Sequence, residues 1–300
     1  MIEAVNISVR KQNKTLLEDV SFRVVPGKVT VVIGQNGAGK STLLECLSGK
    51  NNLSKGHILW DGQAMKQLSM NELATRRAVL AQSHQLAFPI RVEELVEMGS
   101  YITTDPISSQ KLEQLISHAL AEVEMTAFRG RSFNSLSGGE QKRVLLAKCI
   151  VQLNCCHWAD IDKYLLLDEP SASLDLQQQY KLVDLLKQFV RRRNIGLLAV
   201  LHDLNLAAYF ADEILILQKG RQLAIGSPQE VLTPDILRQS MGIEALVGSH
   251  PVYDCLQITP YHLPNPVKKK LSKRSIQNSS EYDNHNQFKK KGGRIEVDRA

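Results

Sequence analysis

The residues best suited to chemistry lie between an apolar run at 29–33 and a helical pattern at 41–47. Three glycines there, Gly34, Gly37 and Gly39, let the backbone turn tightly and present its N–H groups to phosphate oxygens. The start of the following helix adds free N–H donors and a partial positive charge. This spacing predicts a phosphate-binding loop between a strand and a helix. The loop consists of Gly34, Gln35, Asn36, Gly37, Ala38, Gly39, Lys40, Ser41 and Thr42.

Two carboxylates form the second reactive group. They follow an apolar run at 164–167, which has the composition of a strand buried on both faces of a parallel sheet. Asp168 is placed to hold Mg²⁺, together with the Ser41 hydroxyl of the loop. Glu169 can polarise an attacking water molecule, while Lys40 reaches the β- and γ-phosphates. The two groups together predict a nucleoside triphosphatase with Glu169 and Lys40 as catalytic residues.

A third segment, Leu-Ser-Gly-Gly-Glu-Gln at 136–141, opens a further helical pattern. A helix start with free N–H groups and a serine hydroxyl can bind an anion. The three segments together resemble the ATP-binding-cassette family, for which this segment is the signature, and the resemblance covers residues 2–247. It implies an α/β fold of the P-loop NTPase type. That fold has a RecA-like core, an antiparallel β-lobe and an inserted helical subdomain, and it hydrolyses ATP with Mg²⁺.

The resemblance also implies a head-to-tail homodimer that sandwiches two ATP molecules. Gln82 matches a glutamine that reaches Mg²⁺, and His202 matches a switch histidine that hydrogen-bonds to the γ-phosphate. Ser173-Leu174-Asp175 matches a loop whose aspartate, Asp175, crosses the dimer interface. The signature residues bind the ATP held by the other chain: Ser137, Gly138, Gly139 and Gln141.

One position departs from the family pattern. Cassette ATPases usually stack adenine on an aromatic side chain upstream of the loop, but the matching stretch near Val9 has no aromatic residue. Two substitutes are open, because Arg10 could stack its guanidinium plane on the base or Val9 could pack against the ring. Stacking is worth about 1–3 kcal/mol per base. We therefore expect weaker ATP affinity or laxer base selectivity than in a relative with tyrosine there.

Composition indicates a peripheral rather than an integral membrane protein. The 300 residues are 43% hydrophobic, enough for one substantial core with a smaller lobe. No apolar run approaches the roughly 20 residues of a membrane span. The first residues lack the basic and apolar regions of a signal peptide. Five scattered cysteines suit a reducing compartment.

Strand and helix patterns alternate around the loop, which favours an α/β core with a partly parallel sheet. We expect a cassette domain at 1–250, with a helical subdomain of about residues 83–160 inserted in it. Strands are expected near 2–9, 20–25, 29–33, 57–60, 78–81, 164–167, 197–201, 213–218 and 222–225. Helices are expected near 40–48, 109–124, 139–152, 176–193, 204–211 and 234–240, with Pro228 and Pro234 opening short helices.

The transported compound is suggested only by resemblance. Residues 83–99 resemble the importers of iron chelates, haem and cobalamin, and their Leu-Ala-Phe-Pro stretch is most similar to the haemin importers. This implies an ATPase on the cytoplasmic face of the bacterial inner membrane. Its partners would be an integral membrane permease and, indirectly, a periplasmic substrate-binding protein. Import of a ferric siderophore or of cobalamin is the alternative.

A non-transport cassette ATPase is a more remote alternative. Too few residues separate Gln82 from Leu136 for the long coiled coil of the DNA-repair type, and one set of motifs does not match the two cassettes of the translation type. The loop at 154–163 contains Cys155, Cys156 and His157, which are able to ligate iron. Without a second ligand cluster, we interpret it as a solvated connection.

The C-terminal tail differs in composition from the rest. Residues 267–300 hold ten Lys and Arg against four Asp and Glu, and the whole chain has a net charge of +6, so the remainder is neutral. A polar, charged tail cannot bury enough surface to fold alone, so we expect residues 265–300 to be disordered. Contact with anionic lipid head groups is the alternative. Because the basic character comes from the tail, nucleic acid is not expected as a partner.

Overall fold

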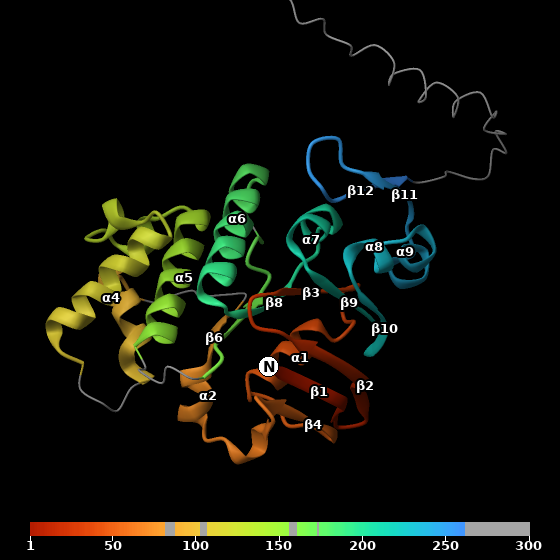
Figure 1. The fold of residues 1–300 in the computed structure, drawn as a ribbon, viewed down its shortest axis with the longest axis horizontal. Coiled ribbons are helices and arrows are strands. Elements are labelled where there is room, and N and C mark those ends of the chain that lie inside the picture. The colour runs from red at the N-terminus through yellow and green to blue at the C-terminus, as the bar shows by residue number, and fades with distance from the viewer. Residues whose placement is uncertain (82–87, 103–106, 156–160, 173, 262–300) are drawn as a thin grey trace, which may run out of the picture. The chain divides into compact units, whose positions relative to one another are not determined.

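The computed structural model describes residues 1–81, 88–102, 107–155, 161–172 and 174–261. Its N-terminal part is an antiparallel sheet with the strand order β2-β1-β4-β5 (Figure 1). β2 begins six residues before the expected strand at 20–25, because its polar first half pairs with β1 through several register shifts. The strands are β1 (Ile2–Lys11), β2 (Lys14–Val24), β4 (Lys55–Trp60) and β5 (Gln63–Ala64).

The central sheet has six strands in the order β10-β9-β3-β8-β7-β6. All neighbours pair in parallel except β9 and β10, which are antiparallel. Parallel strands end at the same edge of a sheet, so the residues that follow β3, β7 and β8 meet there. The strands are β3 (Val29–Ile33), β6 (Arg77–Leu80), β7 (Tyr164–Asp168), β8 (Gly196–Val200), β9 (Glu213–Gln218) and β10 (Arg221–Gly226).

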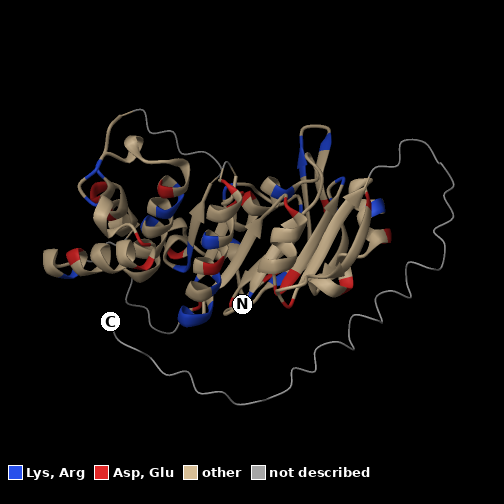
Figure 2. Ribbon diagram, turned by 90° about the horizontal axis from the view of Figure 1, so that it is seen from above, with Lys and Arg blue, Asp and Glu red and all other residues tan. Residues whose placement is uncertain are grey.

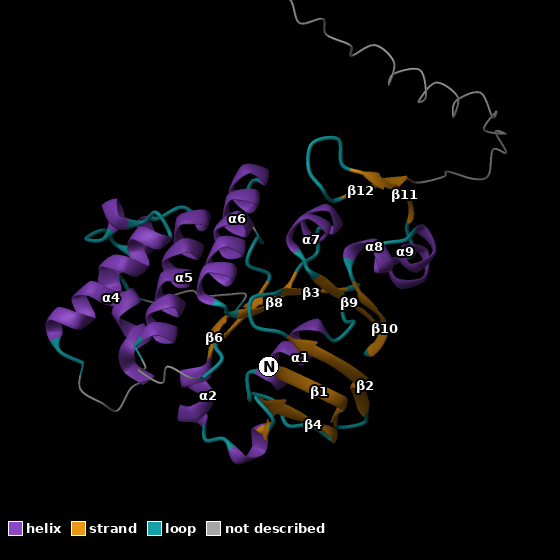
Figure 3. Cartoon of the chain, in the orientation of Figure 1, coloured by secondary structure: helices purple, strands orange, loops and turns teal. Residues whose placement is uncertain are grey.

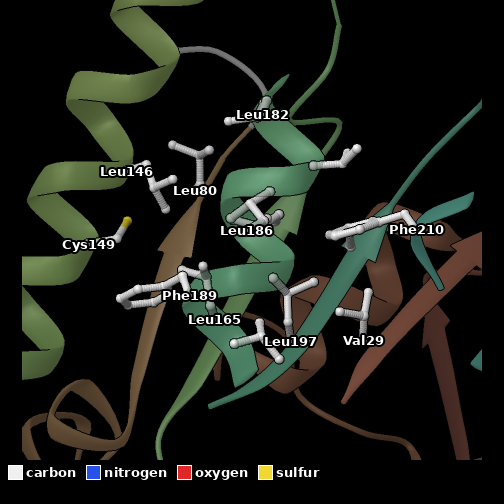
Figure 4. Packing of buried hydrophobic residues seen from close by; sticks show 14 of the residues in the cluster. Val29, Leu80, Leu146, Cys149, Leu165, Leu182, Leu186, Phe189, Leu197 and Phe210 are labelled. Carbon is white, nitrogen blue, oxygen red and sulfur yellow. The ribbon is translucent and has the colours of Figure 1, made fainter. Parts of the chain in front are cut away.

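Apolar clusters cover both faces of the central sheet. Alternate residues of one strand serve the two faces, since Val31 belongs to the cluster beneath the long helices and Val32 to the cluster around α1 (Lys40–Leu47). In the first cluster, α5 (Gly138–Asn154) and α6 (Leu176–Arg193) pack against strand residues such as Leu165 and Leu197 (Figure 4). This packing fixes the strand ends that carry the candidate site.

Between β6 and β7 the described residues form helices, apart from an isolated bridge between Arg91 and Ser132. They lie to one side of the central sheet (Figure 3). Arg129 joins two of these helices, because its guanidinium donates to Glu93 at 2.8 Å and to Glu113 at 2.5 Å. The helices are α3 (Val92–Glu97), η2 (Met98–Ile102), α4 (Ser109–Glu122), η3 (Thr126–Phe128), η4 (Phe133–Ser135) and α5.

The last described residues form a hairpin, β11 (Glu244–Ser249) and β12 (Leu256–Tyr261), which carries the described chain beyond the expected boundary at 250. The Asn205 side chain pairs with its edge, donating to Ile258 O at 3.0 Å and accepting from Ile258 N at 2.7 Å. Asn205 belongs to α7 (Leu204–Phe210), so one amide side chain joins the hairpin to this helix. The other helices are η1 (Met65–Gln67), α2 (Met70–Arg76), α8 (Pro228–Val231) and α9 (Pro234–Met241).

Charged residues of both signs are interspersed along the described ribbon (Figure 2). Among the helices of that part, none is long and apolar enough to span a membrane. The basic tail at 265–300 lies outside the described residues.

Candidate functional site

The predicted phosphate-binding loop joins β3 to α1. Gly39 is the N-cap of α1 and has a φ of 104°, in the left-handed region. A Cβ at this position would lie 2.6 Å from Leu17 Cδ2 and 2.9 Å from Leu16 O. Only glycine therefore lets the loop close against β2, and the closure presents the free N–H groups of α1 to the space above it.

Lys40 is held beneath this loop. Its side chain is buried, and its Nζ donates to Gly34 O at 2.8 Å and to Gln35 O at 3.1 Å. Burial lowers the pKa of Lys40, while the negative charges of Glu169 and Asp168 act in the opposite direction. The ammonium group is thus pre-positioned between the loop carbonyls and the two carboxylates.

Asp168 ends β7 and faces the same place. Its Oδ1 is buried and has no hydrogen-bond partner among the described residues, while the carboxylate accepts a hydrogen bond from Ser41. Burial raises the pKa of Asp168, and the like charge of Glu169 raises it further. A buried carboxylate oxygen without a partner, next to a hydroxyl, fits the oxygen ligands that Mg²⁺ prefers.

Glu169 and His202 form a hydrogen-bonded pair at the ends of neighbouring strands. His202 Nε2 donates to Glu169 Oε1. The Glu169 side chain is 16% exposed and the His202 side chain 45% exposed, so the pair lies at the border between protein and solvent. Glu169 has a φ of 50°, an uncommon value for a residue with a side chain, which directs it out of the line of β7. An oriented carboxylate beside solvent can accept a proton from water.

A cavity of about 480 Å³ opens above the loop. Its walls contain residues that were predicted from sequence and others that were missed, the latter from the start of β2 and from the β9–β10 turn. The predicted residues are Asn36, Gly37, Gly39, Lys40, Ser41, Thr42 and Glu169. The missed residues are Lys14, Thr15, Leu16, Lys219 and Gly220. The β9–β10 turn lies about 180 residues downstream of the loop in the sequence, and no motif marks it.

Val9 is not part of this cavity wall. Its side chain is only 4% exposed and packs in the core of the β-lobe, with Leu17 opposite it. Contact between Val9 and a base in the cavity, one of the two substitutes considered above, is therefore excluded by its burial. Arg10, the other substitute, is exposed but does not line the cavity either.

The signature turn is built as a helix cap. The Ser137 hydroxyl and backbone N–H both bond to Glu140 Oε2 at 2.8 Å, and Ser137 Oγ accepts from Glu140 N at 3.4 Å. Gln141 fixes the turn from within, because its Nε2 donates to Leu136 O at 3.1 Å and to Phe133 O at 3.3 Å. Ser137 and Gly138 are exposed, and neither they nor Gly139 and Gln141 line the cavity.

Other predicted residues lie elsewhere. Asp175 caps α6 by accepting from Gln178 N at 2.8 Å and does not line the cavity. Gln82, Ser173, Cys156 and His157 lie outside the described residues. Cys155 is buried after α5, where its thiol donates to Gln152 O at 3.2 Å. No cluster of three or more potential metal ligands occurs among the residues that the structure describes.

Comparison with known families agrees with this geometry. The model of the ABC transporter family matches residues 17–172, which include the loop, the signature turn and both carboxylates. The chain belongs to the ABC transporter family. This ABC chain is 40% identical to the "Hemin import ATP-binding protein HmuV" of Hahella chejuensis, over 84% of this chain and 96% of that protein. It is 41% identical to the protein of the same name from Pseudomonas fluorescens, again over 84% and 96%.

A solved ABC structure has the same fold. It is an inward-facing transporter described as of the metal-chelate type, with a TM-score of 0.73 and 25% identity. The match covers 87% of this chain and 97% of that one. The predicted fold class, an α/β P-loop NTPase of the ABC type, is thereby confirmed.

Proposed function

We propose that this chain is the ATP-hydrolysing subunit of an importer that takes haemin across the bacterial inner membrane. The observation that carries the proposal is the Glu169–His202 pair beside a cavity whose floor is the phosphate-binding loop. A loop of this kind binds a nucleoside triphosphate, and the oriented carboxylate supplies the base for its hydrolysis. The haemin assignment rests on the names of relatives that match most of the chain.

ATP enters the cavity with its phosphates on the loop residues 34–42. The N–H groups at the start of α1 bind phosphate oxygens, and Lys40 balances the charge that develops on the γ-phosphate. Ser41 and Asp168 would hold Mg²⁺, with Gln82 as a further proposed ligand. Bound Mg²⁺ would neutralise phosphate charge and orient the phosphates for in-line attack.

Hydrolysis then depends on the residues after β7 and β8. Glu169 accepts a proton from the attacking water, and His202 keeps the carboxylate oriented. The exposed part of the imidazole of His202 remains available to hydrogen-bond to the γ-phosphate. Loss of the γ-phosphate removes this contact, which is a local change that can be passed on to a larger assembly.

A second copy of the chain completes the site. The helix start at Ser137, Gly138 and Gly139, of which the first two are exposed, can bind an anion, but it does not line the phosphate-loop cavity of its own chain. In a head-to-tail homodimer this helix start would instead bind the ATP held in the cavity of the partner copy. Gln141 supports the turn from within, and Asp175 orients the start of α6 beside that interface.

The signature turn can be tested against a matched cap elsewhere in the chain. Ser227 caps α8 with the same geometry, because its hydroxyl bonds to Glu230 Oε2 at 2.8 Å and accepts from Glu230 N at 3.4 Å. We expect Ser137→Ala and Ser227→Ala each to lower the free energy of unfolding by about 1 kcal/mol. Only Ser137→Ala should also lower ATP turnover and ATP-induced dimerisation. Equal turnover in the two variants would argue against a role of the turn in binding ATP.

The proposed partners follow from the importer assignment. A permease spans the membrane, the ATPase dimer lies on its cytoplasmic face, and a periplasmic binding protein delivers the cargo. Ferric siderophore or cobalamin is the second candidate cargo, and the solved transporter of the metal-chelate type favours keeping it. Both candidates use the same ATPase mechanism.

Cargo-stimulated turnover tests the proposal. The subunit would be reconstituted with its permease in liposomes, and ATP turnover measured with haemin-loaded, siderophore-loaded and cobalamin-loaded binding proteins. Stimulation by haemin alone is expected. Stimulation by another cargo would keep the mechanism and replace the haemin assignment. Turnover that no cargo stimulates would contradict the importer function.

A further inference from the structure

The part of the cavity wall that belongs to no recognised motif comes from the start of one strand and from one turn. Lys14, Thr15 and Leu16 begin β2, and Lys219 and Gly220 join β9 to β10. The two segments are some 200 residues apart in the sequence but line the same cavity as the phosphate-binding loop. Each contributes one lysine, and none of the described lining residues is aromatic.

The turn that carries Lys219 is fixed to the phosphate-binding loop. Gly220 N donates to Ala38 O at 3.0 Å, and Gly220 O accepts from Glu18 N at 2.8 Å. Arg221 adds an ion pair with Glu18 at 2.9 Å. The β9–β10 turn is therefore bonded on one side to the loop and on the other to β2, so the backbone of Lys219 has a defined position at the cavity.

The side chains of Lys14 and Lys219 are not paired with other groups of the described chain. Both are exposed, and within the described part of the chain neither lysine side chain makes a hydrogen bond or an ion pair. The one carboxylate in the cavity wall, Glu169, lies with Lys40 and Ser41 at the loop. Two unpaired cations at the rim of a cavity attract a ligand that presents hydrogen-bond acceptors or negative charge.

The phosphates of a bound nucleotide occupy the loop, so the nucleoside faces the remaining wall. Leu16 offers that wall an apolar patch, and the lysines offer donors without acceptors. Guanine presents two adjacent acceptors, O6 and N7, to a lysine, whereas adenine presents N7 next to an amino group that donates. A rim of lysines therefore suits guanine at least as well as adenine.

We propose that Lys14 and Lys219 bind the base and ribose of the nucleotide through acceptor atoms, in place of an aromatic stack. This inference rests on the proposed ATPase function and specifies the nucleotides that the site accepts. The chain should bind GTP about as tightly as ATP. Both lysines determine specificity, and neither takes part in the hydrolysis step.

The test compares Lys14→Ala/Lys219→Ala with Lys55→Ala/Lys66→Ala, two exposed lysines outside this cavity. Both double variants lose the same charge. Dissociation constants would be measured by calorimetry for Mg-ATP, Mg-GTP and tripolyphosphate, which has neither base nor ribose. We expect wild-type affinities for ATP and GTP within about threefold of each other. The cavity variant should lose about tenfold for GTP, less for ATP and nothing for tripolyphosphate, as expected for base contacts.

The outcomes separate this inference from the proposed function. Equal loss for tripolyphosphate would mean that the lysines act on phosphate charge, and unchanged GTP affinity would mean that they do not touch the base. Either result overturns the inference while ATP binding by the wild type keeps the ATPase assignment. A wild type that selects ATP strongly over GTP also overturns it. If the wild type binds no nucleotide and no tripolyphosphate, the proposed function fails first.

Discussion

Replacing Glu169 with glutamine is expected to lower ATP turnover by about 10²- to 10⁴-fold, the usual contribution of a general base. The amide keeps the size of the side chain and still accepts the hydrogen bond from His202, but it cannot take a proton from water. ATP affinity should therefore change little. Because hydrolysis would no longer separate the two copies, the variant should remain a dimer in ATP.

The measurements are phosphate release, the dissociation constant of ATP, and size-exclusion chromatography with and without ATP. Glu213→Gln is a suitable control, since Glu213 is a part-buried carboxylate at the opposite, amino-terminal end of a strand in the same sheet. It should leave turnover unchanged. If Glu169→Gln hydrolysed ATP at the wild-type rate, Glu169 would not be the base.

Asp168→Asn should make the ligand-free protein more stable at neutral pH and at the same time remove its response to Mg-ATP. The pKa of Asp168 is raised in the folded state, first by burial and then by the charge of Glu169. Between the ordinary pKa of 3.8 and the raised folded value, the unfolded chain therefore binds fewer protons than the folded one. Stability falls as the pH rises through this range, and ionised Asp168 leaves it lower at neutral pH. Asparagine carries no charge and avoids this cost.

Thermal unfolding across pH tests this prediction. At pH 7 the variant should melt at a higher temperature than the wild type, and the difference should vanish as the pH falls below about 4, where Asp168 is protonated in both states. Mg-ATP should raise the melting temperature of the wild type but not that of the variant. Turnover should fall at least about a hundredfold, since the metal supplies several kcal/mol of charge stabilisation. A less stable variant at pH 7 would show that burial and the charge of Glu169 do not disfavour the ionised form of Asp168 in the folded protein.

The sequence predicted those parts of the site that are encoded locally. The phosphate-binding loop and the two carboxylates are short strings that follow buried strands, so residue order alone indicates their place. His202 could be predicted only from resemblance to a family, because a histidine after a strand has no chemical signature of its own. Its pairing with Glu169 depends on β7 and β8 being neighbours, which is a property of the sheet.

Features that depend on long-range contacts were not predictable. Lys219 lines the cavity only because hydrogen bonds from Gly220 to Ala38 and from Glu18 to Gly220 join distant segments. The hairpin β11–β12 was missed because only one residue of each strand is buried, so neither strand forms a long apolar run. Its attachment depends on one amide, Asn205, which the sequence presents as an ordinary helix residue.

The position of β3 has a consequence for how the protein is made. This strand lies between β8 and β9, so its neighbours at residues 196–200 and 213–218 are synthesised long after it. Until then both edges of a strand that is wholly buried in the folded protein are unpaired, which is a known route to aggregation. We therefore expect the nascent chain to be prone to aggregation until residues 196–218 have been synthesised. A chain truncated before residue 196 would contain the complete phosphate-binding sequence but would lack both strands that pair with β3, so we expect it not to hold the loop in place.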